Sequence, residues 1–284
     1  MLNRFDNLIE LLNLKQPCSI IRLGNVEATQ LLKNGDEVHD QIYTNAGFFG
    51  DLKELRKWKA LTLKAIKNAD GNLKVVTCES FYVCDDVMTK FKLWLPTLPY
   101  VEDLDFWLNL INSLNTNKLG FVTYFKKDIE RQLPKMSWIQ QRISINKTTR
   151  EFRIIKSENT IRGNEPDHKK WEDVLEELFE NCMKEDRDIY FVSCGCYGVP
   201  LCDKLKSAGK KAIYIGGLLQ LIFGIMGKRW ITRPVITRHI NAHWIYPSEK
   251  PMNGDKVEGW CYGNINKNTP LEDIKELQRR NKQN

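Results

Sequence analysis

Residues 189–217 constrain the fold more than any other part of this chain. A buried strand is followed by a glycine-containing turn, a helix and a second buried strand, over 189–193, 194–198, 199–208 and 211–215. A strand, a helix and a strand in this order form a parallel pair joined by a right-handed crossover. Parallel pairs need helices on the faces of their sheet, so this unit predicts a layered α/β fold.

Helical and strand patterns alternate along the rest of the chain. Apolar residues at helical spacing predict further helices over 3–14, 26–33, 49–68, 84–93, 103–114 and 167–184. Short apolar runs predict strands over 19–23, 73–77 and 119–125. The weak alternation over 143–155 predicts a hairpin around Lys147-Thr148-Thr149. We therefore expect a Rossmann-like α/β fold, with a mostly parallel sheet and helices on both faces.

The 284 residues are expected to form one domain. Within it, an N-terminal half over 1–133 contains the first strand end, a C-terminal half over 167–262 contains the glycine-rich turns, and 270–284 is a charged helix or tail. Apolar residues make up 42% and charged residues 28% of the chain, which argues against extended disorder. No apolar run reaches the roughly 18 residues that cross a bilayer, so no membrane span is expected.

The N-terminus, the cysteines and the charge bear on the compartment and the partners. The first residues lack the segments of a signal peptide, so we expect a cytoplasmic protein whose 8 cysteines are thiols. The 4 histidines argue against a histidine-rich metal centre. The net charge of +7 favours anionic partners, and it leaves nucleic acid, phosphorylated metabolites and acidic glycans open.

Two glycine-marked strand ends form the first candidate site. Gly195 and Gly198 follow the strand over 189–193, and Gly216 and Gly217 follow the next strand. Glycines in a turn before a helix allow a phosphate to approach backbone N–H groups. A nicotinamide cofactor is disfavoured, because the first glycine of the dinucleotide fingerprint and its later acidic residue are missing. The alternative is that the glycines serve only tight turns.

A third strand end carries polar groups. Arg22 and Gly24 come directly after the first predicted strand, and Asn25 and Glu27 flank one residue at the start of the next helix. Oxygen atoms in such a pair can hold a divalent cation beside a diphosphate. The alternative, which spacing alone favours, is that Asn25 caps the helix and Glu27 interacts with the helix dipole.

Residues 227–262 are basic, aromatic and rich in loop-forming residues. Lys228 and Arg229 have the charge to neutralise a leaving diphosphate. Glu258 lies among glycines and aromatic residues and is the carboxylate most expected to act as acid or base, although a solvated glutamate is an equal alternative. The aromatic side chains suited to sugar rings in an acceptor are Trp230, His243, Trp244 and Trp260. A run of this kind also suits single-stranded nucleic acid, but no recognised module accompanies it.

The run over 191–230, from Phe191 to Trp230, resembles the C-terminal signature of the GT-D-type glycosyltransferases, which were first described as a bacterial domain of unknown function. Two shorter segments, over 19–27 and 256–262, are similar to the same family. The similarity is spread over most of the chain, and the 191–230 run is its specific part.

This resemblance implies a Rossmann-like transferase that moves a sugar from a nucleotide diphosphate, usually UDP, with a divalent metal such as manganese or magnesium. The family's Asp-x-Glu pair at the nucleotide and metal site corresponds to Asn25 and Glu27 here. Asparagine in place of aspartate removes one negative charge, which weakens metal binding. The chain also resembles proteins of large algal DNA viruses that build capsid glycans, including a xylosyltransferase, which implies UDP-xylose as donor and the host cytoplasm as location.

The leading hypothesis is an inverting glycosyltransferase with an oligosaccharide or glycoprotein acceptor and no nucleic-acid partner. A carboxylate must take the proton of the attacking hydroxyl, and Glu258 is the first choice and Glu27 the second. The glycines of both turns form the floor of the diphosphate site, below Arg22 and Lys228 or Arg229. Two alternatives stay open: a methyltransferase or dehydrogenase with the same glycine crevice, and a non-enzymatic protein that binds nucleic acid through its charge.

Overall fold

The computed structural model describes residues 4–75, 80–93, 97–100, 103–143, 145, 150–161, 166, 169–227, 230 and 233–248. These residues contain one seven-stranded sheet in the order β3-β2-β1-β7-β6-β4-β5, and every neighbouring pair is parallel. The strands are β1 (Cys18–Ile21), β2 (Gly71–Val75), β3 (Thr97–Tyr100), β4 (Lys118–Thr123), β5 (Glu151–Lys156), β6 (Ile189–Ser193) and β7 (Lys211–Tyr214).

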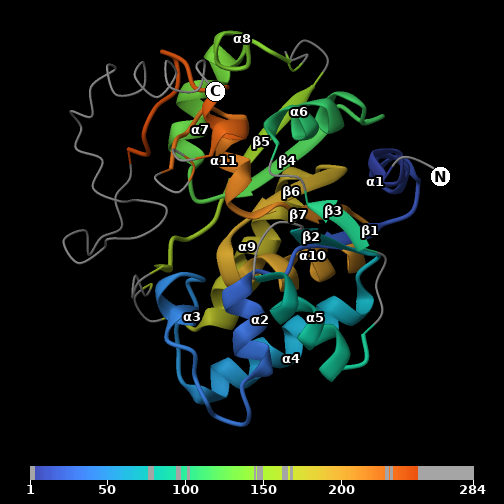
Figure 1. The fold of residues 1–284 in the computed structure, drawn as a ribbon, viewed down its shortest axis with the longest axis vertical. Helices are drawn as coiled ribbons and strands as arrows, with labels where there is room; N and C mark the ends of the chain where they lie inside the picture. Colours follow the sequence, from blue (N-terminus) through green and yellow to red (C-terminus); the bar gives the residue numbers. More distant parts are fainter. Residues whose placement is uncertain are drawn as a thin grey trace.

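Helices cover both faces of this sheet (Figure 1). One face carries α2 (Asn25–Leu32), α3 (Gln41–Thr44), α4 (Leu52–Asn68), α5 (Ser80–Lys90), α9 (Trp171–Glu185) and α10 (Gly198–Ser207). The other carries α1 (Arg4–Asn13), α6 (Leu104–Asn112), α7 (Lys126–Gln132), α8 (Met136–Ile139), α11 (Leu219–Ile222) and α12 (Pro234–Thr237). The expected α/β fold, with a parallel sheet and helices on both faces, is confirmed. No helix in the described part of the chain has the length and apolar character to span a membrane.

The sheet separates two hydrophobic cores. Successive strand residues point to opposite faces, so in β6 Phe191 packs into one core while Tyr190 and Val192 pack into the other. Trp107 of α6 lies fully buried in the first core, and Trp58 of α4 lies fully buried in the second. Large buried side chains therefore pack against both faces of the sheet and fix the positions of its strands.

The chain leaves neighbouring strands toward opposite faces at the carboxyl edge of the sheet. After β7 it passes through η4 (Gly216–Leu218) into α11, whereas β1 and β6, on either side of β7, continue into α2 and α10 on the other face (Figure 1). Open α/β sheets bind ligands where the chain diverges in this way. A ligand site is therefore expected at the ends of β1, β7 and β6.

The structure corrects three local predictions. The hairpin expected over 143–155 is wrong, because β5 is a single strand that pairs in parallel with β4. The strand β3 was not predicted. Asn25 is the first residue of α2 rather than its cap, and Gly24 holds the cap position without a side-chain hydrogen bond. The charged helix or tail expected over 270–284 lies outside the described residues.

Candidate functional site

Arg22 and Gly216 meet at the adjoining carboxyl ends of β1 and β7. The two strands pair directly, with Ile20 opposite Ile213, so the residues that follow them are neighbours. A β-carbon built on Gly216 would lie 2.5 Å from Nη1 of Arg22, which means that the guanidinium rests against the glycine backbone. Gly216 has a φ angle of +60°, a conformation that glycine adopts without strain. Both residues were predicted to lie at one site, and the structure brings them into contact.

Glu27 lies beside this contact, in the first turn of α2. Its carboxylate packs against the α-carbon of Gly24, and only 8% of the residue is exposed. Burial raises the pKa of the Glu27 carboxyl above its ordinary value, and the positive charge of Arg22 opposes that shift with a smaller effect. The end of β1 therefore combines a guanidinium with a carboxyl that holds its proton more tightly than an exposed glutamate does.

The glycines of the turn after β6 are explained by close packing. Gly195 has a φ angle of +57° and lies against the carbonyl oxygen of Ala46, which accepts a 2.8 Å hydrogen bond from the backbone N–H of Cys196. Gly198 lies under the ring of Tyr214, whose hydroxyl donates to the carbonyl of Gly195 at 3.1 Å. These contacts favour the alternative in which both glycines serve a tight turn. They do not leave an open glycine floor at this turn.

The thiols near this turn are poor nucleophiles in this structure. Burial raises the pKa values of Cys194, Cys196 and Cys202 well above the ordinary value, so all three are protonated at neutral pH. The sulfur of Cys196 also accepts a 3.0 Å hydrogen bond from the indole N–H of Trp171. The expectation that cysteines are reduced thiols agrees with the six free cysteines among the described residues.

The metal expected at Asn25 and Glu27 stays a prediction. Asn25 is exposed and Glu27 is buried, although the two residues belong to the same helical turn. The donor set is one carboxylate and one amide beside the Arg22 guanidinium, and a neighbouring cation disfavours a second one. These residues do not fit a divalent ion well, so no chemical step below is routed through a metal at this place.

The predicted aromatic acceptor residues are placed differently from the expectation. Trp230 and Trp244 are buried in the core on the α6 side of the sheet, so neither indole face is open for a sugar ring in this structure. Gly217, the other predicted floor residue, is half-buried. Four predicted site residues lie outside the described residues: Lys228, Arg229, Glu258 and Trp260.

His243 is half-buried beside a tryptophan that sequence reasoning missed. The ring centroids of His243 and Trp138 are 5.4 Å apart, and 57% of Trp138 is exposed. Asn241 fixes this arrangement, because its side-chain amide donates to the carbonyls of Trp138 and Ile139 at 3.2 and 3.0 Å. The side-chain amide of Gln132 donates to the carbonyl of His243 at 2.8 Å. An exposed tryptophan and a half-buried histidine are thus held next to each other by hydrogen bonds to their backbone carbonyls.

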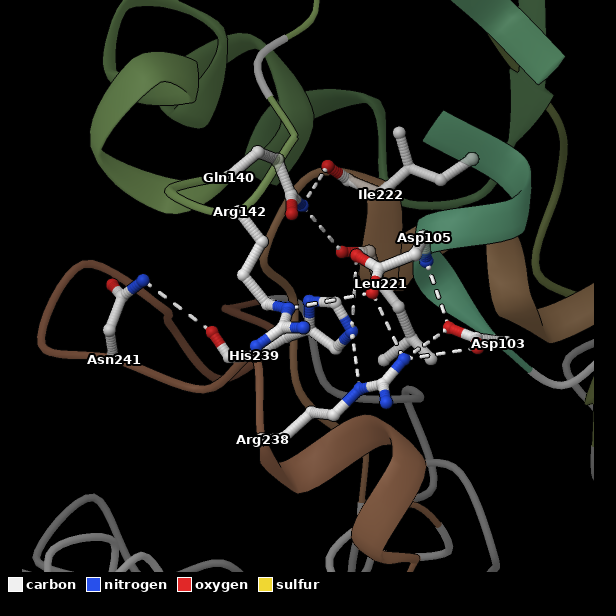
Figure 2. Close-up of polar contacts among 9 residues, drawn as sticks. All are labelled: Asp103, Asp105, Gln140, Arg142, Leu221, Ile222, Arg238, His239 and Asn241. Carbon is white, nitrogen blue, oxygen red and sulfur yellow. Dashed lines mark hydrogen bonds and ion pairs between the residues drawn. The ribbon is translucent and has the colours of Figure 1, made fainter. Parts of the chain in front are cut away.

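A second polar cluster lies at the start of α6, and sequence reasoning missed it (Figure 2). Arg238, at the end of α12, bridges Asp103 and Asp105, while His239 and Arg142 lie next to Asp105. Asp103, Asp105 and His239 each offer a ligand atom, and these atoms lie within 4.8 Å of one another. This arrangement is compatible with a divalent metal. The only local signal was the pair of aspartates before a helix, which is also typical of a helix cap.

Comparisons with known proteins do not establish the family of this chain. No protein-family model matches it, and no curated protein matches it. Among solved structures it is similar to the selenomethionine-substituted structure of domain of unknown function 1792. That match has 11% sequence identity and a TM-score of 0.42, and it covers 76% of this chain and 83% of the other. A similarity at this level does not determine an activity.

Proposed function

We propose that this protein is a glycosyltransferase with a nucleotide-sugar donor, and that the donor's diphosphate binds at the Arg22–Gly216 contact. The observation that carries the proposal is this contact between a guanidinium and a glycine backbone, at adjoining strand ends that lead to opposite faces of the sheet. Nucleotides bind at such places in open α/β sheets. The resemblance of 19–27 and 191–230 to one transferase family supports sugar transfer over the other reactions of this fold.

Arg22 is the group proposed to stabilise the leaving diphosphate. Its planar guanidinium presents paired N–H donors that match two phosphate oxygens. The N-terminus of α2, which begins directly after Gly24, adds backbone N–H groups and the positive end of a helix dipole. Negative charge develops on the departing diphosphate, and donors already in position lower the barrier to that step. Lys228 and Arg229 belong to the same proposal as additional positive charges.

A carboxylate is proposed to accept the proton of the acceptor hydroxyl. The hydroxyl oxygen attacks the anomeric carbon as the bond to the diphosphate oxygen breaks, and a single displacement of this kind inverts the configuration. Glu258 remains the first choice for the base and Glu27 the second. The raised pKa of Glu27 supports its candidacy, because a base works best when its pKa lies nearer to the operating pH.

Trp138 and His243 are proposed to hold the acceptor glycan, in place of the buried Trp230 and Trp244. Sugar rings have apolar faces of C–H groups, and an exposed aromatic ring offers them a flat apolar surface. Trp138 is exposed on α8, and hydrogen bonds from Asn241 fix its backbone. Trp260 stays in the proposal as a further aromatic contact.

The finer assignments follow from the sequence resemblance alone. UDP is the proposed nucleotide, xylose is the first sugar to test, and the proposed location is the cytoplasm, of a host cell if the protein is viral. Manganese or magnesium stays a prediction, because Asn25 and Glu27 do not fit a divalent ion well. The test therefore compares donor binding with and without the metal.

The proposal is tested by donor binding. Thermal shifts with UDP- and GDP-sugars, with and without manganese, are compared with S-adenosylmethionine and NAD, since a ligand stabilises the state that it binds. We expect a nucleotide sugar to raise the melting temperature of the wild type and of Arg56→Gln, but not of Arg22→Gln. Arg56 is a matched control because its guanidinium is exposed and pairs with Asp36. Stabilisation by S-adenosylmethionine or NAD alone, or an unchanged response of Arg22→Gln, would overturn the proposal.

A further inference from the structure

The polar cluster at the start of α6 brings together three segments that are distant in sequence. Asp103 and Asp105 precede and open α6, Arg142 follows α8, and Arg238 and His239 follow α12 (Figure 2). None of these residues belongs to the ends of β1, β6 or β7. Asp103 and Asp105 instead come after β3, so the cluster uses a different strand end from the proposed diphosphate site.

The two arginines of this cluster contact three of the four carboxylate oxygens of Asp103 and Asp105. Nη2 of Arg238 lies 2.8 and 3.0 Å from the two oxygens of Asp103 and 3.0 Å from Oδ2 of Asp105. Nε of Arg142 lies 3.4 Å from the same Oδ2. Oδ1 of Asp105 is buried and has no hydrogen-bond partner among the described residues. One carboxylate oxygen thus stays unsatisfied in a cluster that holds two guanidinium groups.

His239 is the side chain next to that unsatisfied oxygen. Its side chain is only 2% exposed, and Nε2 lies 3.7 Å from Oδ1 of Asp105, too far for a hydrogen bond. Nε of Arg238 donates to the same Nε2 at 3.3 Å, which makes Nε2 an acceptor. Nε2 of His239 and Oδ1 of Asp105 are therefore neighbouring acceptor atoms: Arg238 donates to Nε2, and Oδ1 has no donor among the described residues.

A metal ion fits between these two atoms. Zinc binds imidazole nitrogen at about 2.0–2.1 Å and carboxylate oxygen at about 2.0–2.2 Å, so an ion bound to both atoms allows a separation of up to about 4.3 Å. The observed 3.7 Å between Nε2 of His239 and Oδ1 of Asp105 corresponds to a bent nitrogen–metal–oxygen angle. Asp103 supplies the third ligand atom within 4.8 Å of the others.

We propose that Asp103, Asp105 and His239 bind one divalent transition-metal ion, and that Arg238 is the cation that takes its place when the metal is absent. Arg238 donates to Nε2 of His239 and to both oxygens of Asp103, so its guanidinium and the metal compete for two of the three ligands and cannot occupy the cluster together. Arg238 can move out because its side chain is 37% exposed. Arg142, on Oδ2 of Asp105, stays beside the metal and orients that carboxylate.

This competition makes a prediction that a purely structural ion cluster does not make. Removing Arg238 removes the competitor, so Arg238→Gln should bind zinc at least tenfold more tightly than the wild type. Asp105→Asn and His239→Gln each remove a ligand and should weaken zinc binding at least tenfold. If the cluster serves only to hold α6 and α12 together, all three variants bind no zinc there and differ only in stability.

Equilibrium dialysis against zinc measures the stoichiometry and the affinity of the full-length protein and the three variants. Cobalt substitution is a second readout: oxygen and nitrogen ligands give only weak visible bands, whereas thiolate ligands add an intense charge-transfer band. This distinguishes the cluster from adventitious binding to the cysteines. Circular dichroism checks that each variant is folded. Should one ligand variant not fold, the wild type, Arg238→Gln and the remaining variant still decide the result.

We expect one zinc equivalent in the wild type, tighter binding in Arg238→Gln and loss of binding in the two ligand variants. Absence of stoichiometric binding in both the wild type and Arg238→Gln would overturn the proposal. Zinc binding that is unchanged in Asp105→Asn and His239→Gln would also overturn it. A cobalt spectrum that shows only the thiolate band would do the same.

Discussion

The guanidinium of Arg22 lies so close to the backbone of Gly216 that a β-carbon on that glycine would approach Nη1 to 2.5 Å. The contact joins the ends of two paired strands, and it requires both a residue without a side chain and a φ angle of +60°. Any substitution at 216 must therefore move Arg22, change the backbone, or do both.

Gly216→Ala is expected to destabilise the protein and to abolish donor binding. A left-handed conformation costs a residue with a β-carbon about 1–2 kcal/mol, and displacement of the guanidinium adds to that cost. Gly209→Ala is a matched control, because Gly209 has a φ angle of +81° and no atom within 4 Å of the added β-carbon. Urea unfolding measures the free energy of both variants. Equal losses of stability and of donor binding in the two variants would contradict a specific role for the Arg22 contact.

Glu27→Gln is expected to change the pH dependence of stability. The folded state raises the pKa of Glu27 above its ordinary value of 4.5, so the folded protein holds this proton to higher pH than the unfolded chain does. The contribution of Glu27 to stability is therefore fully present below about pH 4.5 and is lost as the pH rises through the folded-state value. Glutamine does not titrate, so this loss should be missing in the variant.

The measurement is urea unfolding of the wild type and Glu27→Gln between about pH 4 and about pH 8. The free energy of unfolding of the variant, minus that of the wild type, should become more positive as the pH rises. A difference that stays constant across this range would show that Glu27 has an ordinary pKa in the folded protein.

The central strands were predictable from sequence, and the edge strands were not. β6 and β7 are buried on both faces and read as short apolar runs with glycines after them, which is a local signal. β3 contains Pro99, which argues against a strand, yet β3 lies at the edge of the sheet where a missing N–H is tolerated. β5, at the opposite edge, pairs in parallel with a strand that precedes it by a long helical connection, and periodicity carries no information about that partner.

The candidate site was predictable only where topology determines proximity. Arg22 and Gly216 follow two strand ends, and a parallel sheet places such ends at one edge. Arg238 and Asp103 are separated by 135 residues and meet through tertiary packing, for which the sequence has no pattern. The basic and aromatic composition of residues 227–262 likewise does not specify which rings are buried. Trp244, which was predicted to contact the acceptor, is part of the core.

Trp58→Phe is expected to loosen the turn that contains Gly195. The indole N–H of the fully buried Trp58 donates to the carbonyl of Cys196 at 3.0 Å, which links α4 to the turn after β6. Phenylalanine removes this donor and leaves a buried carbonyl without it, at a cost of about 1–3 kcal/mol. Urea unfolding measures the loss. Trp138→Phe, a change at an exposed tryptophan, is the control and should cost less than about 0.5 kcal/mol. Similar losses in both variants would argue against the buried hydrogen bond.

Trp138→Ala is expected to weaken acceptor binding while leaving the protein folded and the donor site intact. An exposed ring contributes little to stability, so the melting temperature should change only slightly. Loss of stacking on a sugar ring should raise the acceptor KM about fivefold to tenfold, which corresponds to about 1–1.4 kcal/mol. The donor KM should not change, because Trp138 lies on α8 and the proposed diphosphate site lies at the ends of β1 and β7.

Steady-state kinetics with the acceptor and the donor varied separately make this measurement, once a donor sugar has been identified by the thermal-shift panel. Leu14→Ala is the control, because Leu14 is also an exposed apolar residue but follows α1 and has no place in the proposed acceptor site. A rise in acceptor KM for Trp138→Ala but not for Leu14→Ala would support the Trp138–His243 pair as an acceptor platform. An unchanged acceptor KM, or an equal rise in both variants, would remove that pair from the proposed mechanism and leave Trp260 as the remaining aromatic contact.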